Sequence, residues 1–365
     1  KISDIGTVVG GATPSTKKPE NYENGTIAWI TPKDLSTFNG RYIQHGERNI
    51  TETGLKSCST QLLPKNTVLF SSRAPIGYVA IAANDVCTNQ GFKSVIPNEN
   101  TNPLFLYYLL KYNKDKIEGM GSGTTFKEVS GNTMKNIVVS VPTDKKVQER
   151  ISSMLGSIDD KIEENERINN NLEQQAQAIF DNMFPNTSSG DKFIGDFITP
   201  KRGKNLLSKN AIFGDVPVVA GGLEPSTYHN VSNTQAPVLA ISASGANAGY
   251  VSLWNTPIWS SDSSYIDSSM TNDVYFWYVL LKKRQTEIFD TQTGSAQPHI
   301  YPQHIATMPI TNISNDDIST FTNTVTPIFE RIGHNKAENI RLSALRDTLL
   351  PKLMSGELDV SDIDL

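Results

Sequence analysis

The chain has 365 residues, a length that predicts two or three domains. Hydrophobic residues make up 37% and charged residues 19%, which is typical of folded globular proteins and excludes collagenous, fibrous and wholly disordered classes. The formal net charge of −5 argues against an indiscriminately basic nucleic-acid binder. No apolar run approaches the roughly 18 residues of a bilayer span, and no signal-peptide segment opens the sequence. We therefore expect a cytoplasmic protein without membrane association. Because the sequence lacks an initiating Met, we also expect that further residues precede Lys1.

Secondary structure is predicted in two similar stretches. Apolar runs bounded by turn residues predict strands at 26–30, 67–70, 77–82 and 137–141, and again at 216–219, 238–242 and 258–260. Amphipathic helices are predicted at 103–117 and 272–289. Asn102 and Pro103 are suited to the N-cap and first position of the earlier helix. The sequence therefore predicts two domains of the α+β class.

Two long helical patterns follow these stretches and match each other. The first carries Ile158, Ile162, Asn165, Asn169, Leu172, Ile179 and Met183. At an offset of 170 residues, the second carries Ile328, Ile332, Asn335, Asn339, Leu342, Leu349 and Leu353. The correspondence continues upstream, where Gly77-Tyr78-Val79 reappears as Gly249-Tyr250-Val251. The sequence therefore indicates an internal duplication of one structural unit.

The duplication predicts segments at 1–143, 144–184, 185–312 and 313–354, with a tail at 355–365. Helices of about 40 residues span roughly 60 Å, and their apolar seams need partners. Because a duplicated unit closing on itself has approximate two-fold symmetry, we expect an antiparallel coiled coil. Its seam comprises Ile158, Ile162, Asn165, Leu172 and Ile179 with Ile328, Ile332, Asn335, Leu342 and Leu349. Pro327 should kink the second helix or mark its effective start; two unconnected surface helices are the alternative.

Catalytic and metal motifs are missing from the sequence. No Walker A string, His-Glu-x-x-His or Gly-x-Ser-x-Gly elbow occurs. Cys58 and Cys87 lack Cys-x-x-Cys spacing and are read as ordinary core thiols. His299 and His304 lie close in sequence, but nothing supplies a third ligand at a recognisable spacing. We therefore predict no metal site and no catalytic residues.

Polar loops at equivalent places in both copies favour recognition. The segments 121–127 and 293–299 follow the inner helix of each copy. Arg73 and the pair Asn89–Gln90 supply side chains that can read guanine and adenine bidentately. Gly and Ser loops with hydroxyls and cations can approach phosphates and base edges closely. The alternative is that these are ordinary solvated turns.

Five motifs make the chain resemble the specificity subunits of Type I restriction-modification systems. They are Gly11-Ala12-Thr13-Pro14, Ile30-Thr31-Pro32-Lys33-Asp34-Leu35, Ser72-Arg73-Ala74-Pro75-Ile76-Gly77, Thr88-Asn89-Gln90-Gly91-Phe92 and the terminal Leu349-Leu350-Pro351-Lys352-Leu353-Met354-Ser355-Gly356-Glu357. The resemblance covers essentially the whole chain. The second copy departs from it, since its start reads Ile198-Thr199-Pro200-Lys201-Arg202-Gly203-Lys204 and Ala243-Ser244-Gly245 replaces the Arg-Ala-Pro segment.

The resemblance implies two target-recognition domains, 1–143 and 185–312, each reading one half of an asymmetric bipartite site in double-stranded DNA. It implies spacer helices at 144–184 and 313–354 that set the unread gap and dock the methyltransferase subunits. Adenine methylation with S-adenosylmethionine and ATP- and Mg-dependent cleavage would belong to the modification and restriction subunits, so no cofactor is expected on this chain. The candidate DNA-binding residues are Lys33, Arg73, Asn89, Gln90, Lys93, Thr124, Thr125, Lys127, Lys201, Arg202, Lys204, Ser244, Asn247, Ser261, Asp262, Gln297 and His299.

Two other classes of protein compete with this interpretation. One is an enzyme, namely a methyltransferase or nuclease with its own DNA-reading domains. The missing catalytic and metal motifs argue against this class. The other is a scaffold that pairs proteins through the coiled coil without contacting DNA.

Overall fold

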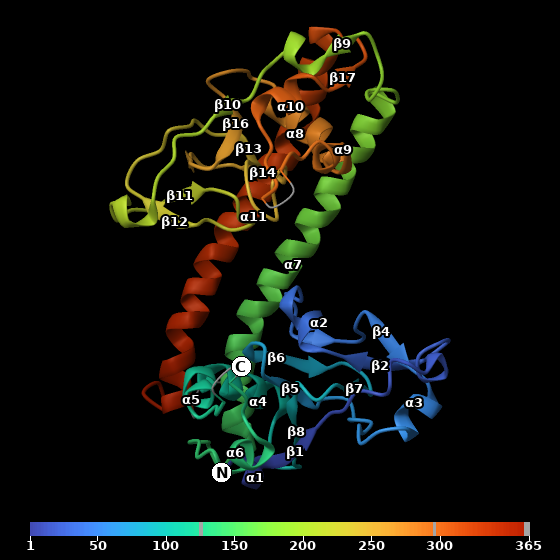
Figure 1. Ribbon diagram of the computed structural model, residues 1–365. Helices are drawn as coiled ribbons and strands as arrows, with labels where there is room; N and C mark the ends of the chain where they lie inside the picture. The colour runs from blue at the N-terminus through green and yellow to red at the C-terminus, as the bar shows by residue number, and fades with distance from the viewer. Residues whose placement is uncertain (124–126, 295–296, 361–365) are drawn as a thin grey trace. The chain divides into compact units, whose positions relative to one another are not determined.

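The computed structural model describes residues 1–123, 127–294 and 297–360 of a chain that folds into two compact units (Figure 1). Unit 1 comprises Lys1–Glu163 and Ile340–Leu365, and unit 2 comprises Glu164–Asn339. Each unit contains mixed sheets and helices, so the α+β class is confirmed. Within the described ranges, no helix is long and apolar enough to cross a membrane.

Unit 1 is built on a five-stranded sheet with the order β1-β8-β5-β6-β3. Its strands are β1 (Gly6–Gly10), β3 (Tyr42–Ile43), β5 (Val68–Ser72), β6 (Ile76–Ala82) and β8 (Lys93–Pro97). A second sheet, β4-β2-β7, contains β2 (Ile27–Ile30), β4 (Arg48–Ile50) and β7 (Cys87–Thr88). Strands β2 and β7 run parallel, with Ile30 beside Thr88, so the residues after both strands leave from the same edge.

Helices cover the larger sheet of unit 1. The short helices are α1 (Ile2–Ile5), α2 (Pro32–Ser36), α3 (Glu52–Lys56), α4 (Pro103–Tyr112), α5 (Lys114–Gly119) and α6 (Gly131–Asn136), with a 3-10 turn η1 at Pro19–Asn21. Helix α4 buries every side chain from Phe105 to Leu110, as expected of a helix covered on both sides. Its N-terminus is capped as predicted, since Asn102 Oδ1 accepts from the Phe105 amide at 2.9 Å. The predicted single helix 103–117 is divided at Asn113 into α4 and α5.

Unit 2 repeats part of this arrangement and adds a two-stranded sheet, β17-β9. One sheet has the order β10-β16-β13-β14 and another the order β12-β11-β15. The strands are β9 (Lys192–Phe193), β10 (Lys201–Arg202), β11 (Val216–Val219), β12 (Thr227–His229), β13 (Val238–Ser242), β14 (Val251–Trp254), β15 (Trp259–Ser260), β16 (Ser263–Asp267) and β17 (Pro309–Ile310). The helices are α8 (Val274–Lys283), α9 (Gln285–Asp290) and α10 (Pro302–Ala306), with 3-10 turns η2 (Ile194–Asp196) and η3 (Ser208–Asn210). The pairs β11–β15 and β2–β7 are both parallel, which matches the internal duplication.

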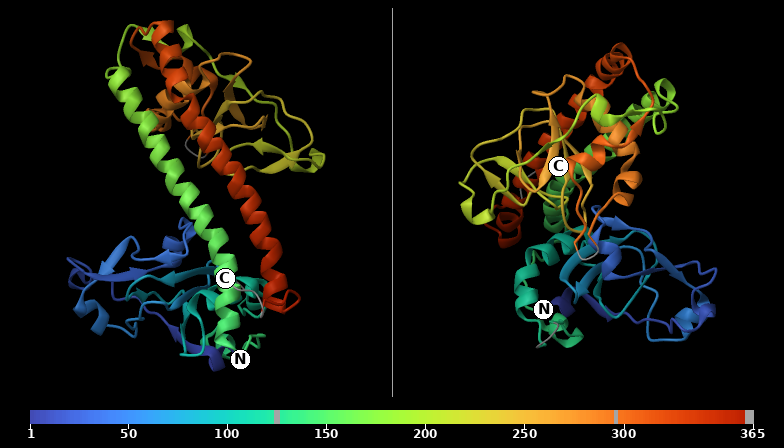
Figure 2. Two further views of the ribbon diagram at one scale, coloured as in Figure 1. Left: turned by 180° about the vertical axis from the view of Figure 1, so that it is seen from behind. Right: turned by 45° about the horizontal axis from the view of Figure 1, so that its top comes forward.

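Two long helices, α7 (Lys145–Met183) and α11 (Asn315–Ser355), each contribute to both units. Within each unit they lie side by side (Figures 1 and 2). In unit 1 their ends enter the core through Leu155 and Leu353. In unit 2 the aromatic side chains of Phe180, Phe321 and Phe329 pack around α8. The apolar side chains of the two long helices therefore pack against the cores of the units as well as against each other.

The strand predicted at 137–141 is wrong, and so is one of the two alternatives for Pro327, that it marks the effective start of its helix. No strand forms at 137–141: Ile137 accepts from the Ile2 amide, but Val138 is exposed and no neighbouring strand extends a ladder to it. Pro327 does not mark the effective start of its helix, because α11 begins twelve residues earlier at Asn315. Packing of Phe321 and Val325 in the unit 2 core stabilises the turns that precede the proline.

Candidate nucleic-acid interface

In unit 1, loops that are distant in sequence converge at the carboxyl ends of β2, β5 and β7. A Cβ atom at Gly11 would overlap the carbonyl oxygens of Thr88 and Asn89, so glycine permits this close approach of two backbones. The Thr13 hydroxyl donates to the side-chain oxygen of Gln90. The Ser72 amide donates to the carbonyl of Gly91 at 2.7 Å. These contacts place the Arg73 loop and the Asn89–Gln90 loop beside each other.

The charged side chains of this loop cluster meet at a carboxylate. Glu128 Oε1 accepts from Lys93 Nζ at 3.2 Å, and Glu128 Oε2 lies 3.5 Å from Arg73 Nη1. Reciprocal backbone hydrogen bonds with Ser122 fix Glu128 at the base of the 122–128 loop. The side chains of Arg73 and Glu128 keep 35% and 38% of their surface exposed, so both can be reached by a ligand. Glu128 is not among the residues predicted from the sequence, because no local pattern links it to Lys93, which lies 35 positions away.

The other predicted residues of unit 1 fall in three groups. Asn89 shapes its own loop, because its Oδ1 accepts from the Gly91 amide at 2.8 Å. Lys127 is exposed, whereas Thr124 and Thr125 lie outside the described residues. Lys33 donates to Glu47 Oε2 at 2.8 Å, and this hydrogen bond raises the pKa of the exposed Lys33 ammonium. The structure therefore pairs Lys33 with Glu47 and gathers Arg73 and Lys93 around Glu128.

An equivalent loop cluster lies in unit 2 after β11, β13 and β15. A Cβ atom at Gly203 would overlap the carbonyls of Ser260 and Ser261, the same relation that Gly11 has in unit 1. Asp262 Oδ1 accepts from Arg202 Nη2 at 2.6 Å. Its other oxygen accepts from the Ser244 hydroxyl. A carboxylate again holds an arginine at this edge.

Pro298 and His299 join this cluster, as Glu128 does in unit 1. Ser244 forms a bridge with His299, and the Gly245 amide donates to the Pro298 carbonyl at 3.1 Å. The backbones of Thr293 and His299 exchange two hydrogen bonds. His299 occupies the position that Glu128 has in unit 1, since each closes the corresponding bridge. The side chains at matched positions therefore differ while the backbone arrangement is repeated.

The remaining predicted residues of unit 2 differ in accessibility. Lys201, Lys204 and Gln297 are exposed. Asn247 is half-buried, and its carbonyl accepts from the Tyr250 amide. Ser261 is 3% exposed, and its hydroxyl accepts from the Leu206 amide at 2.9 Å. Ser261 therefore positions the loop and presents little surface to a ligand.

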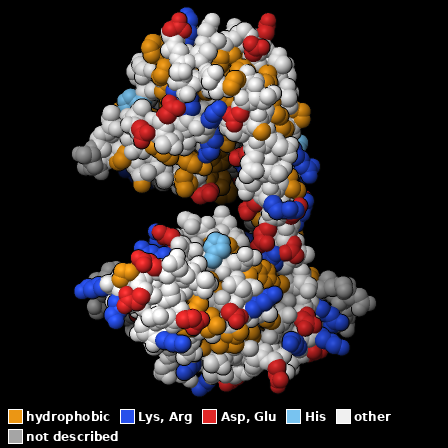
Figure 3. Space-filling model, turned by 90° about the vertical axis from the view of Figure 1, so that its right-hand side faces the viewer, with side chains coloured by type: hydrophobic (Ala, Val, Ile, Leu, Met, Phe, Trp, Pro, Cys, Tyr) orange, Lys and Arg blue, Asp and Glu red, His pale blue; other side chains and the backbone are white. Residues whose placement is uncertain are grey.

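Charges of both signs are interspersed on the surface. On the face that Figure 3 shows, Lys and Arg side chains lie among Asp and Glu side chains. In the part of the chain that the structure describes, no group of three His, Cys, Asp or Glu side chains is placed to bind a metal ion.

The long helices are antiparallel, as predicted, and polar residues fix their register. In unit 2, Asn165 Nδ2 donates to Asn339 Oδ1 at 2.8 Å, and Asn335 Nδ2 donates to Asn169 Oδ1 at 2.8 Å. Asn165 and Asn335 are buried, and Ile332 beside them is fully buried. The other predicted seam residues are half-buried, namely Ile158, Ile162, Leu172, Ile179, Ile328, Leu342 and Leu349. Buried amide pairs of this kind tolerate few alternative registers.

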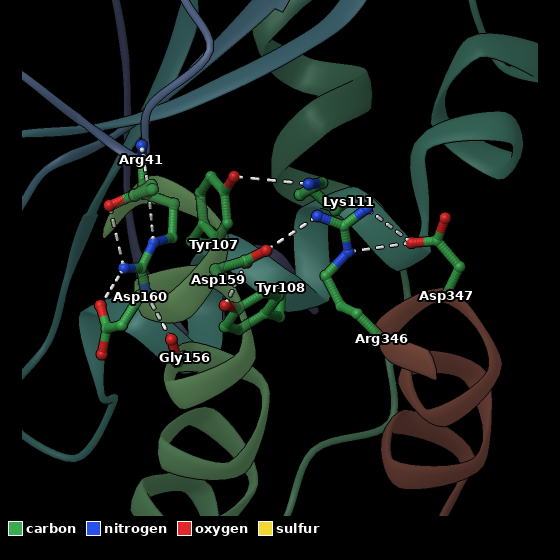
Figure 4. Close-up of polar contacts among 10 residues, drawn as sticks. Arg41, Tyr107, Tyr108, Lys111, Gly156, Asp159, Asp160, Arg346 and Asp347 are labelled. Atoms are coloured by element: carbon green, nitrogen blue, oxygen red, sulfur yellow. Dashed lines mark hydrogen bonds and ion pairs between the residues drawn. The ribbon is translucent and has the colours of Figure 1, made fainter. Parts of the chain in front are cut away.

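In unit 1 a charged network joins both helices to the domain (Figure 4). Asp159 of α7 accepts from Tyr108 Oη at 2.6 Å and from Arg346 Nη1 of α11 at 2.8 Å. Burial raises the pKa of Tyr108, so its hydroxyl remains a donor. Arg41, which precedes β3 and is 5% exposed, pairs with Asp160 and with Glu163 at 2.9 Å. The network therefore fixes α4, α11 and the β3 segment on one turn of α7.

Comparisons with known proteins show the family of the chain. A family model described as the Type I restriction modification DNA specificity domain matches residues 1–174. The chain is 34% identical over 406 residues to the Type I restriction enzyme MjaIX specificity subunit of Methanocaldococcus jannaschii, covering 100% of this chain and 94% of that protein. It is 30% identical over 167 residues to the EcoR124I/EcoR124II specificity subunit of Escherichia coli, covering 43% of this chain and 40% of that protein.

The fold is likewise shared with a solved structure. The crystal structure of a Type I restriction-modification system S subunit from M. genitalium superposes with a TM-score of 0.60 at 19% identity, over 99% of this chain and 96% of that one. The DNA specificity domain and the full-length relative define the class of protein as a DNA-specificity subunit. The chain belongs to the specificity subunits of Type I restriction-modification systems.

Proposed function

We propose that each loop cluster reads one half of an asymmetric bipartite site in double-stranded DNA. The observation that carries this proposal is the repetition of one backbone arrangement with different side chains at matched positions. Glu128 of unit 1 corresponds to His299 of unit 2. Since base edges are read by side-chain donors and acceptors, equivalent scaffolds with different groups read different sequences. The two half-sites therefore differ.

The remaining predicted residues belong to this proposal as reading or phosphate-contacting groups. In unit 1, Gln90 and Lys127 border the cluster, and in unit 2, Lys201, Lys204 and Gln297 are exposed beside it. Exposed lysines suit phosphates, because an ammonium acts there as a point charge. Arginines and amides suit base edges, because they donate in a fixed geometry.

The helices serve as spacer and docking surface in this proposal. Residues 1–143 and 185–312 are the target-recognition domains, with spacer segments 144–184 and 313–354 and a tail at 355–365. Because α7 and α11 each continue from one unit into the other, their length sets the unread gap. Modification subunits dock on the helices and restriction subunits assemble with them.

In this proposal, the modification and restriction subunits carry out the catalytic reactions. Membership in a non-catalytic family supports a chain that binds no S-adenosylmethionine, ATP or Mg of its own. The family works on DNA together with other subunits, which supports location in the cytoplasm.

The proposal is tested by reciprocal variants in the assembled modification complex. Arg73→Ala and Arg202→Ala should each relax one half-site only, by roughly 1 to 3 kcal/mol if the guanidinium contacts a base edge. Mapping of methylated positions across a genome reads both half-sites at once. Lys65→Ala is the matched control, because Lys65 is an exposed cation at the opposite end of β5 from Arg73. Equal relaxation of both half-sites by either arginine variant would contradict the assignment.

A further inference from the structure

The arginine of each cluster is already paired with a carboxylate. Glu128 holds Arg73 and Lys93 in unit 1, and Asp262 holds Arg202 in unit 2. The two carboxylates do not occupy equivalent positions: Glu128 forms a backbone bridge with Ser122, whereas Asp262 follows β15. Each unit therefore pairs an arginine with a carboxylate, but the carboxylate comes from a different position in the fold.

Such a pair is poorly suited to the DNA backbone. A phosphate that approaches Arg73 also approaches the negative charge of Glu128, and like charges at short range oppose binding. Phosphate contacts supply most non-specific affinity, so a cation that is already neutralised adds little to it. The pair therefore reduces binding to DNA of arbitrary sequence.

The same pair is complementary to one kind of base pair. In the major groove, guanine presents the acceptors N7 and O6, and cytosine presents the N4 amino donor beside them. An arginine donates to guanine, and a carboxylate accepts from cytosine N4. An A·T pair presents these groups in a different order, because the adenine N6 donor lies between the acceptors adenine N7 and thymine O4. With the arginine on the purine, the carboxylate then meets thymine O4, an acceptor, in place of a donor.

We propose, on the basis of the function proposed above, that Glu128 with Arg73 and Asp262 with Arg202 each read a G·C base pair in their half-site. Glu128 and Asp262 are then specificity-determining residues that contact cytosine. Both carboxylates are accessible, with 38% and 34% of their side-chain surface exposed. Lys93, 15% exposed, supports Glu128 from the protein side.

The test uses the assembled complex carrying Glu128→Gln or Asp262→Asn. Competition binding is measured on duplexes in which each base pair of the mapped site is replaced in turn. In the wild type, replacing one G·C pair in each half-site by A·T should weaken binding by roughly 5- to 150-fold. Glu128→Gln should abolish that discrimination in the unit 1 half-site, and Asp262→Asn should do so in the other. The unaffected half-site shows that each variant is folded.

Non-specific binding gives a second readout. Freeing Arg73 and Lys93 in Glu128→Gln should tighten binding to unrelated duplex and steepen the log–log salt dependence by about 0.9 for each new phosphate contact. Glu99→Gln is the matched control, since Glu99 is exposed at the opposite end of β8 from Lys93. Wild-type base preference and salt slope in Glu128→Gln would overturn the inference, as would a half-site without a G·C pair. A wild-type complex without any preferred sequence would instead refute the proposed function.

Discussion

Replacing Asp159 by Ala should destabilise unit 1 far more than an exposed ion pair would suggest. The Asp159 side chain is 7% exposed and accepts from both Tyr108 and Arg346. Its removal leaves the buried Tyr108 hydroxyl without this acceptor, while Arg346 keeps its contact with Asp347 at 2.8 Å. Breaking a buried pair costs about 3–5 kcal/mol, and we expect the lower end because Arg346 remains paired.

Two further variants calibrate that magnitude. Tyr108→Phe removes one hydrogen bond to a charged group and should cost about 1.5–3 kcal/mol. Arg167→Ala removes an exposed pair with Glu164, whose side chains are 77% and 44% exposed, and should cost less than about 1 kcal/mol. The order of the three losses follows from burial of the groups.

Hydrogen exchange by mass spectrometry is the suitable assay, because it reports the stability of each helix segment separately. Protection should fall in 145–163 and 340–355, which belong to unit 1, and stay unchanged in α8 of unit 2. The loss of stability in Asp159→Ala could instead be no larger than that in Arg167→Ala. The apolar contacts of Leu349 and Leu353, and not the polar network, would then stabilise the helix ends in unit 1. Equal loss of protection in α8 would show that the effect is not local.

Matched insertions of seven residues after Glu163 and after Asn339 lengthen each helix by about 10 Å while keeping a heptad register. Methylation mapping should then find unchanged half-sites separated by about three more base pairs, and an unchanged gap would exclude the spacer role. Burial raises the pKa of Cys87 to about 11, so its thiol stays neutral at pH 8 and iodoacetamide should modify the half-buried Cys58 first. Because the folded pKa lies above the ordinary value of 9.0, the stability that the neutral Cys87 thiol contributes should be lost between about pH 9 and 11, measurable as a falling denaturation midpoint.

Regular features of the fold follow from sequence periodicity. Long helices repeat their apolar positions every three or four residues, so Ile158 and Ile328 identify matching helices without any tertiary information. Asn102 marks a helix start because capping is a local interaction. The strand predicted at 137–141 fails for the opposite reason, since strand formation depends on a partner that local sequence does not reveal.

The candidate interface is predictable in outline but not in its charge pairing. Arg73, Lys93 and Arg202 are of residue types that contact DNA, which sequence alone reveals. That Glu128 meets Lys93 across 35 positions is a tertiary fact, as is the pairing of Arg41 with Glu163 across 122 positions. Chain separation hides such pairs unless the fold is known.

The discontinuity of unit 1 has a consequence for synthesis on the ribosome. Residues of its core come from both ends of the chain, with Leu155 on one side of unit 2 and Leu353 on the other. At about 5–20 residues per second, the intervening segment 164–339 takes on the order of 10 to 35 seconds to appear. Unit 2 is therefore complete first, and the part of the unit 1 core that Leu353 and Met354 cover stays exposed until the end of α11 is made. We expect nascent chains that end before Ile340 to retain this exposed apolar surface and to aggregate more readily than the full chain.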